Sequence, residues 1–182
     1  DSVYFIDADK KLKKLANDDA HTVSTVTKTS GDWVHGMTWL NGKIYYLGHA
    51  TDLFFNEVDP ATGATREILK GRADQFGGLS SDALALSGLA TDGTGFYTMF
   101  RGAIYYLTTD GKPKQVAAKG GTPFSFPGSY DPKAPHKAAD LVLIGLQRHN
   151  IAGSNNFLAY RDGSLYVSSK VGTSYVTKID CK

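Results

Sequence analysis

Two histidines are the first candidates for chemistry in this sequence. His35 and His49 lie fourteen residues apart, and an aspartate lies close to each of them, at Asp32 and Asp52. Imidazole and carboxylate groups at one site could act as a general base or bind a metal ion. However, the sequence lacks the close His-x-His or Glu-x-x-His spacing that gives stronger evidence for a metal site. We therefore expect both histidines to be hydrogen-bonded loop residues, and we expect no metal.

Aromatic and cationic residues are the next candidates for a binding site. The indole of Trp33 could stack on a sugar or a cation, whereas we expect Trp39 to fill the core. The two tryptophans are an even number of residues apart, which predicts that they lie on the same side of a strand. Arg148 and His149 could hold an anionic or sugar ligand. The predicted ligand-binding residues are Asp32, Trp33, His35, His49, Asp52, Arg101, Arg148 and His149.

Three hairpin signals indicate that a repeated unit positions these residues. Each is a dipeptide that suits a tight turn with positive φ and joins two short apolar runs. They are Asn41-Gly42, Asp92-Gly93 and Asp162-Gly163. Seventeen residues after each turn glycine, a short strand ends in aspartate, at Asp59, Asp110 and Asp180. The repeated spacing predicts a unit of about 51 residues.

The full units are expected to contain four antiparallel strands each. In the second unit these strands are predicted at 36–40, 43–47, 53–58 and 65–69. A repeated four-stranded unit of this length is typical of a β-propeller blade. The predicted fold class is therefore all-β, a propeller with about four blades in this chain. A β-sandwich or barrel is the alternative.

The N-terminal region is predicted to hold only the last two strands of a unit. Val3 to Asp7 is taken as a further copy of the strand that ends in aspartate. Its following lysine run, Lys10 to Lys14, is predicted to be a solvated edge strand, and 16–32 is predicted to be a loop. The C-terminal region is predicted to hold three strands.

These strands do not add up to whole blades. Either a small ring closes irregularly, or a second chain or a homodimer completes it. Cys181 is the sole cysteine in the sequence and is a candidate for an interchain disulfide. We expect a single domain over 1–182, with an inserted loop near 119–149.

Several segments carry a family resemblance. Residues 87–97 and 160–167, together with the turn at 58–63, resemble blade openings and turns of sugar-lactonase-like and related six-bladed propellers. The resemblance implies the propeller architecture and a ligand at one mouth of the central channel. The WD dipeptide and the kelch double glycine are not evident, and the resemblance assigns no catalytic residue.

Composition narrows the possible functions. A net charge of +2 with scattered lysines and arginines does not favour nucleic-acid binding, and no apolar run approaches the ~20 residues of a membrane helix. The first residue is Asp1, which is compatible with a cleaved signal peptide or a trimmed chain.

Because the predicted loops differ between copies, we expect one composite site and no cofactor. The predicted function is a secreted, lectin-like, non-enzymatic protein that binds a small molecule, glycan or protein. The alternatives are a hydrolase or lactonase-like enzyme, or a structural subunit of a multi-chain propeller.

Overall fold

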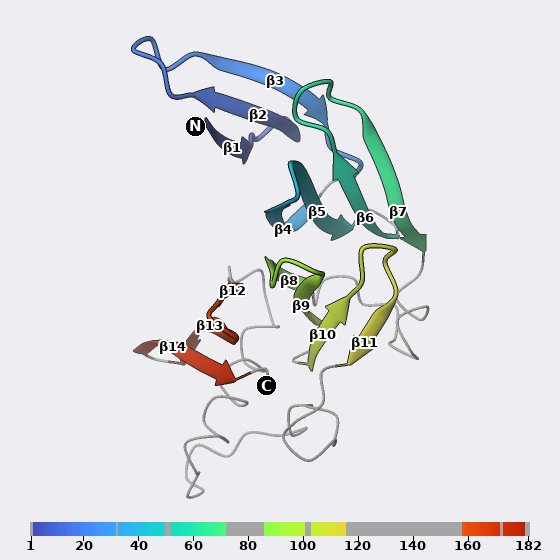
Figure 1. The fold of residues 1–182 in the computed structure, drawn as a ribbon, viewed down its shortest axis with the longest axis vertical. Coiled ribbons are helices and arrows are strands. Elements are labelled where there is room, and N and C mark those ends of the chain that lie inside the picture. Colours follow the sequence, from blue (N-terminus) through green and yellow to red (C-terminus); the bar gives the residue numbers. More distant parts are fainter. Residues whose placement is uncertain are drawn as a thin grey trace, which may run out of the picture.

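The computed structural model describes residues 2–31, 33–49, 52–71, 86–100, 103–115, 158–171 and 173–180. This part of the chain is all-β and forms four antiparallel sheets, none of which is closed. The sheets follow one another in chain order along an arc (Figure 1). Their strands are β1 (Ser2–Ile6), β2 (Lys11–Ala16), β3 (Val23–Lys28), β4 (Trp33–Leu40), β5 (Lys43–His49), β6 (Leu53–Val58), β7 (Thr65–Gly71), β8 (Leu86–Thr91), β9 (Phe96–Phe100), β10 (Ala103–Leu107), β11 (Pro113–Gln115), β12 (Leu158–Arg161), β13 (Ser164–Val171) and β14 (Thr173–Asp180).

The two middle sheets confirm the predicted four-stranded unit. Their strand orders are β4-β5-β6-β7 and β11-β10-β9-β8, so successive strands are hydrogen-bonded neighbours in both. At the β4–β5 turn, Asn41 and Gly42 both have positive φ, as predicted for Asn-Gly. The β8–β9 turn differs, because Asp92 is not in that conformation. Its carboxylate instead accepts hydrogen bonds from the amides of Thr94 and Gly95.

The N-terminal sheet corrects two predictions. It contains three strands, β1-β2-β3, because 23–28 forms a strand within the predicted loop 16–32. Consequently β2, which carries the lysine run, is the middle strand and not an edge. Leu12 of β2 is completely buried, whereas the ammonium group of Lys13 contacts Thr25 and Asp7. Lys13 thus projects from a paired strand and finds acceptors on β3 and in the β1–β2 turn.

The turn at Asp7 was predicted to join the last two strands of a unit. In the structure it joins the first two strands of this sheet. Close approaches between sheets reveal the correct alignment. Gly63, in the β6–β7 turn, lies against Val26 of β3, and Gly111, in the β10–β11 turn, lies against Ile68 of β7. Strand β3 therefore takes the outermost position that β7 takes in the next sheet. It follows that β1 corresponds to β5, the second strand of a unit.

The core is divided into two layers by the sheet β4–β7. On one side, Tyr45, Leu47 and Phe55 pack with residues of β8–β11 such as Phe96. On the other side, alternate residues of the same strands pack against the N-terminal sheet; these are Ile44, Tyr46, Phe54 and Val58, with Leu12. Because successive side chains of a strand point to opposite faces, strands β5 and β6 are apolar on both faces.

The first strands of three sheets approach one another closely. A Cβ atom on Gly36 of β4 would lie 2.5 Å from the backbone of Gly88 and Leu89 in β8. A Cβ on Gly88 would lie 2.8 Å from the side chain of Leu158 in β12. These glycines let β4, β8 and β12 lie side by side in one row.

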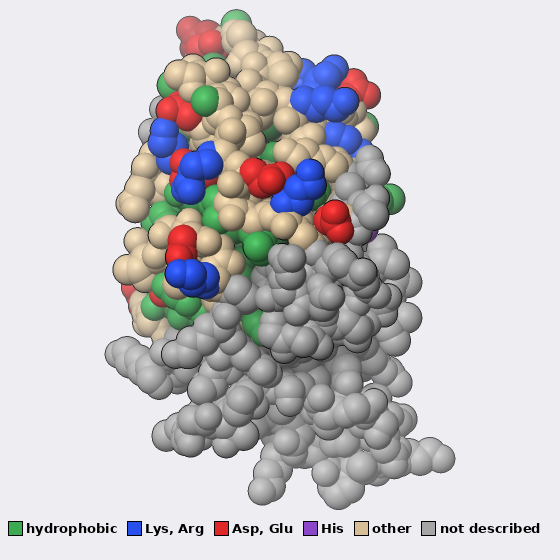
Figure 2. Space-filling view, turned by 90° about the vertical axis from the view of Figure 1, so that its right-hand side faces the viewer, with side chains coloured by type: hydrophobic (Ala, Val, Ile, Leu, Met, Phe, Trp, Pro, Cys, Tyr) green, Lys and Arg blue, Asp and Glu red, His purple; other side chains and the backbone are tan. Residues whose placement is uncertain are grey.

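The C-terminal sheet, β12-β13-β14, confirms the prediction of three strands there. Tyr160 of this sheet stacks on Tyr97 of β9, with ring centres 5.6 Å apart. The predicted insertion at 119–149 lies outside the described residues. On the face shown in Figure 2, basic and acidic side chains of the described part are interspersed. Within that part, the structure contains no helix of the length and hydropathy that crossing a membrane requires.

Candidate functional site

A β-bulge positions His35. Trp33 of β4 pairs with His49 of β5, and Val34 pairs with Gly48, but the next paired residue of β4 is Gly36, opposite Leu47. His35 is therefore the extra residue of a bulge. Bulges re-aim a side chain relative to the regular alternation of a strand. Both histidines were predicted in loops next to these strands; the structure places them within the strands themselves.

The bulge directs His35 onto His49. The Nε2 atom of His35 lies 2.6 Å from Nδ1 of His49, while the ring centres are 4.8 Å apart and the ring planes differ by only 13°. Since the nitrogens are much closer than the ring centres, the imidazoles meet edge to edge through one N–H···N hydrogen bond. One nitrogen must donate and the other must accept, so this bond requires at least one neutral ring.

The environment keeps His35 neutral. His49 is 6% exposed, and His35 is partly buried beside it. Burial, and secondly the charge of His49, lower the pKa of His35 to about 4. At neutral pH the ring of His35 therefore carries no charge. It can exchange hydrogen bonds with a ligand but does not attract an anion by charge.

Next to His35, an exposed tryptophan lies at the mouth of a pocket. Trp33 is 59% exposed, and the ammonium nitrogen of Lys10 lies 5.0 Å from its ring centre, a cation–π contact. The pocket has a volume of about 350 Å³ and opens between the N-terminal sheet and β4. Its lining residues are Ile6, Asp7, Lys10, Trp33, Val34, His35, Gly36 and Met37.

Trp39, which was predicted to fill the core, is 48% exposed. Its ring stacks on Tyr4 of β1 at a centre-to-centre distance of 5.7 Å. Both tryptophans thus contact the N-terminal sheet, Trp39 at Tyr4 and Trp33 at Lys10. The bulge at His35 shifts the alternation, so that Trp33 lies opposite His49 while Trp39 lies opposite Ile44.

Asp52 lines a second pocket, of about 390 Å³, together with Glu67 and Lys70. Ser30, Gly31, Leu53 and Phe54 complete its wall. Asp52 therefore lies near the histidine pair along the chain but is not among the residues that line the pocket of His35. The predicted cluster of two histidines with two aspartates is thus reduced, in the described residues, to the two histidines.

Four predicted site residues, Asp32, Arg101, Arg148 and His149, lie outside the described residues, as does Cys181. The sequence reasoning also missed Lys10 and Asp7, which line the pocket of Trp33. Aligning β1 with the second strand of each unit would have found them. That alignment places the β1–β2 turn at the same end of the sheets as the start of β4 and the end of β5.

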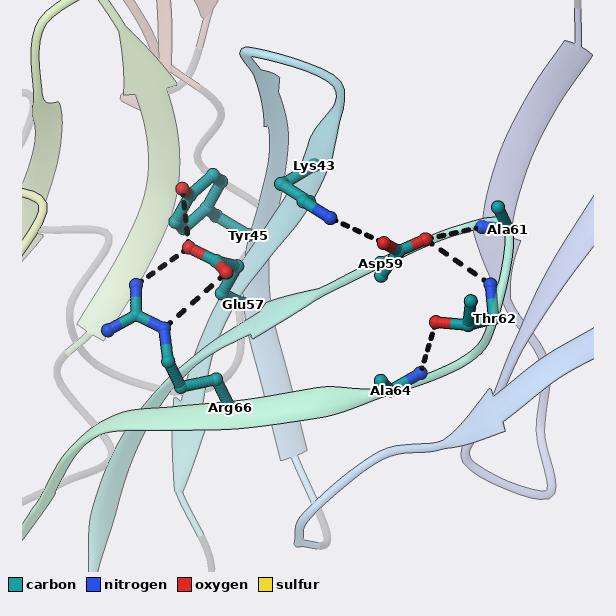
Figure 3. A network of polar contacts seen from close by, with 8 residues as sticks. All are labelled: Lys43, Tyr45, Glu57, Asp59, Ala61, Thr62, Ala64 and Arg66. Atoms are coloured by element: carbon teal, nitrogen blue, oxygen red, sulfur yellow. Dashed lines mark hydrogen bonds and ion pairs between the residues drawn. The ribbon is translucent and has the colours of Figure 1, made fainter.

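A second polar cluster lies at the other end of β5 and β6 (Figure 3). Glu57 accepts hydrogen bonds from the hydroxyl of Tyr45, at 2.8 Å, and from the guanidinium of Arg66, at 2.7 Å. The hydrogen bond from Arg66 lowers the pKa of Glu57. Burial, then the hydrogen bond to Glu57, raises the pKa of Tyr45 to about 12. The ammonium of Lys43 contacts Asp59, which also caps the amides of Ala61 and Thr62. Each charged side chain in this cluster has a partner of opposite charge, which indicates a structural role.

No group of three or more His, Cys, Asp or Glu side chains within the described ranges has the arrangement needed to hold a metal ion. In the histidine pair, one ring nitrogen of each imidazole is already bonded to the other ring. The chemistry available at the pocket of Trp33 is therefore aromatic stacking and hydrogen bonding, with one cation at Lys10.

Comparison with known proteins found no matching family model and no matching curated protein. Among solved structures, the chain is similar to the computationally designed Ika8 protein, with 15% identity and a TM-score of 0.45, over 98% of this chain and 55% of that chain. It is also similar to a GH43 endo-arabinanase from Bacillus licheniformis, with 14% identity and a TM-score of 0.44, over 97% of this chain and 66% of that chain. This chain thus spans less than two thirds of either protein. Both TM-scores are below 0.5, so we transfer neither fold nor activity from them.

Proposed function

We propose that the four sheets are blades of a β-propeller and that this chain is a non-enzymatic protein that binds a carbohydrate at the pocket of Trp33, His35 and Lys10. The observation that carries the proposal is the exposed indole at the mouth of this pocket. An aromatic side chain has a broad apolar face that can pack on a ligand, and this indole lines the same pocket as His35 and Lys10. Stacking on a flat apolar sugar face would bury it.

The polar residues of the pocket suit the same ligand. Sugar hydroxyls both donate and accept hydrogen bonds, and a neutral imidazole can do either. Lys10 and Asp7 add a donor and an acceptor from the β1–β2 turn. Lys10 already covers part of the indole, so a ligand must share the ring with it or use its other face. Secretion, which was expected from the sequence, remains part of this proposal.

The histidine pair gives less support to the hydrolase alternative. A general base near neutral pH needs a pKa close to the working pH, and the pKa of His35 is about 4. Its Nε2 atom is also occupied by His49. These features fit a ring that orients a ligand by hydrogen bonding. They do not fit a ring that removes a proton from it.

The test compares two exposed tryptophans on one strand. Wild type, Trp33→Ala and the matched control Trp39→Ala would be applied to a glycan array, and any sugar that binds would be measured by calorimetry. We expect Trp33→Ala to weaken binding at least tenfold, about 1.4 kcal/mol, and Trp39→Ala to leave binding unchanged. A blank array with folded wild-type protein, or equal losses in both variants, would contradict the proposal.

A further inference from the structure

Among the described residues, the N-terminal sheet has no counterpart of the strand that begins each of the other sheets. In the three sheets that follow, β4 pairs with β5, β8 with β9 and β12 with β13. In the first sheet, β1 corresponds to β5, since β3 takes the outer position of β7. The described residues place no strand on the free side of β1.

The sequence of β1 supports this correspondence. In each second strand an apolar residue precedes a tyrosine: Val3-Tyr4, Ile44-Tyr45, Phe96-Tyr97 and Leu165-Tyr166. The similarity between β1 and β13 extends further, because both begin Ser-apolar-Tyr-apolar. In the last sheet, β12 pairs with β13 so that Ala159 lies opposite Tyr166. The last sheet therefore provides a template for what the edge of β1 can accept.

Apolar side chains are exposed around this edge. Val3 and Phe5 of β1 are 61% and 37% exposed, and Trp39 is 48% exposed where it stacks on Tyr4. Strand β1 contains no charge, proline or bulge, which are the features that usually protect an edge strand from pairing. An added strand would give Val3 and Phe5 cross-strand partners on one face and would approach Trp39 on the other.

We propose that the free edge of β1 is a docking site for one extended peptide segment from outside these 182 residues, which pairs antiparallel with β1. The segment would occupy the position that continues the row β12, β8 and β4. By the β12 template it carries a small residue opposite Tyr4 and large apolar residues opposite Val3 and Phe5. Main-chain hydrogen bonds would supply affinity, as in other cases of strand addition. This inference does not depend on the proposed carbohydrate site.

The first measurement uses Trp39 as the reporter. The sequence contains two tryptophans, so Trp33→Phe leaves Trp39 as the single tryptophan, which is excited selectively over the tyrosines. The probe is a synthetic peptide that copies residues 157–162, and the control peptide replaces alternate residues with proline. We expect a saturable blue shift of Trp39 emission with the first peptide and none with the control. Val3→Lys should weaken binding about tenfold.

A tethered version guards against an affinity too weak to measure. Residues 158–163 would be copied in front of Ser2 in place of Asp1, so that the Asp-Gly turn leads into β1 as it leads into β13. We expect slower hydrogen exchange at the amides of β1 and at least twofold less quenching of Trp39 by iodide. Two results would overturn the proposal. One is a folded tethered protein with neither effect. The other is concentration-dependent dimerisation of wild type that Val3→Lys abolishes, which would show that a second copy covers the edge.

Discussion

The burial of His35 beside His49 makes a quantitative prediction about stability and pH. The pKa of His35 is about 4 in the folded protein, against an ordinary value of 6.5 that applies when the chain is unfolded. Between these values the unfolded chain binds more protons than the folded protein. The free energy of unfolding therefore falls as the pH drops from 6.5 towards 4, and this group adds no further loss below 4.

The size of the effect follows from the same difference. The full displacement of the pKa corresponds to an upper limit of about 3.4 kcal/mol. At pH 4.5 the corresponding limit is about 2.5 kcal/mol. Because His35 is not completely buried, solvent screens part of this energy, and we expect about 1–2 kcal/mol to be lost between neutral pH and pH 4.5.

The perturbation that isolates this contribution is His35→Gln. Glutamine can still exchange a hydrogen bond with His49 but does not titrate in this range. Urea unfolding of both proteins would be followed by tryptophan fluorescence at pH 7 and at about pH 4.5. We expect the loss of stability on acidification to be about 1–2 kcal/mol smaller in the variant than in wild type. Asp7 and Lys10, which line the same pocket, are present in both proteins, so their contributions cancel.

The matched control is His21→Asn, at an exposed histidine in the β2–β3 turn whose φ of 48° asparagine tolerates. This variant should lose as much stability on acidification as wild type. If His35→Gln and wild type lose equal free energy between the two pH values, the inference that burial keeps His35 neutral is wrong.

Two further predictions concern the core. Gly36→Ala places a methyl group 2.5 Å from the backbone of β8, so we expect about 2–3 kcal/mol of destabilisation in urea unfolding; a loss below 0.5 kcal/mol would mean that the strands separate easily. Asn56 is fully buried, and its side-chain amide has no hydrogen-bond partner among the described residues. We therefore expect Asn56→Leu to raise the free energy of unfolding by about 1–2 kcal/mol. A decrease would show that a buried water or another partner holds the amide.

The regular strands were predictable because their signals are local. Alternating apolar residues and an Asn-Gly turn define β4 and β5 over a short window. Strand β3 was missed because it lies on the outside of its sheet, where Ser24, Thr25 and Lys28 are exposed and no apolar alternation develops. Its preceding turn uses His21 in a positive-φ conformation, with no glycine to mark it.

The candidate site was only partly predictable for a different reason. The proximity of His35 and His49 follows from the hairpin, but their hydrogen bond depends on a one-residue bulge that the sequence pattern does not reveal. The same bulge interrupts the regular alternation between Trp33 and Trp39 on which the parity argument relied. Lys10 joins the site through packing between two sheets, which depends on how the units align.

Strand β5 contributes side chains to two core layers. This affects how the free energy of unfolding is distributed over the junctions between sheets. Ile44 and Tyr46 serve one junction between sheets, while Tyr45 and Leu47 serve the next. In the described part of the chain, the core contacts thus link each sheet to its immediate neighbours, as in a linear array whose stability is a sum of units and junctions. Mutations at even and odd positions of β5 should therefore be energetically independent although their residues are adjacent in sequence. After a unit is duplicated, the residues at each junction can then change independently of those at the next junction. The alternation of side chains between the two faces of the strand must be kept.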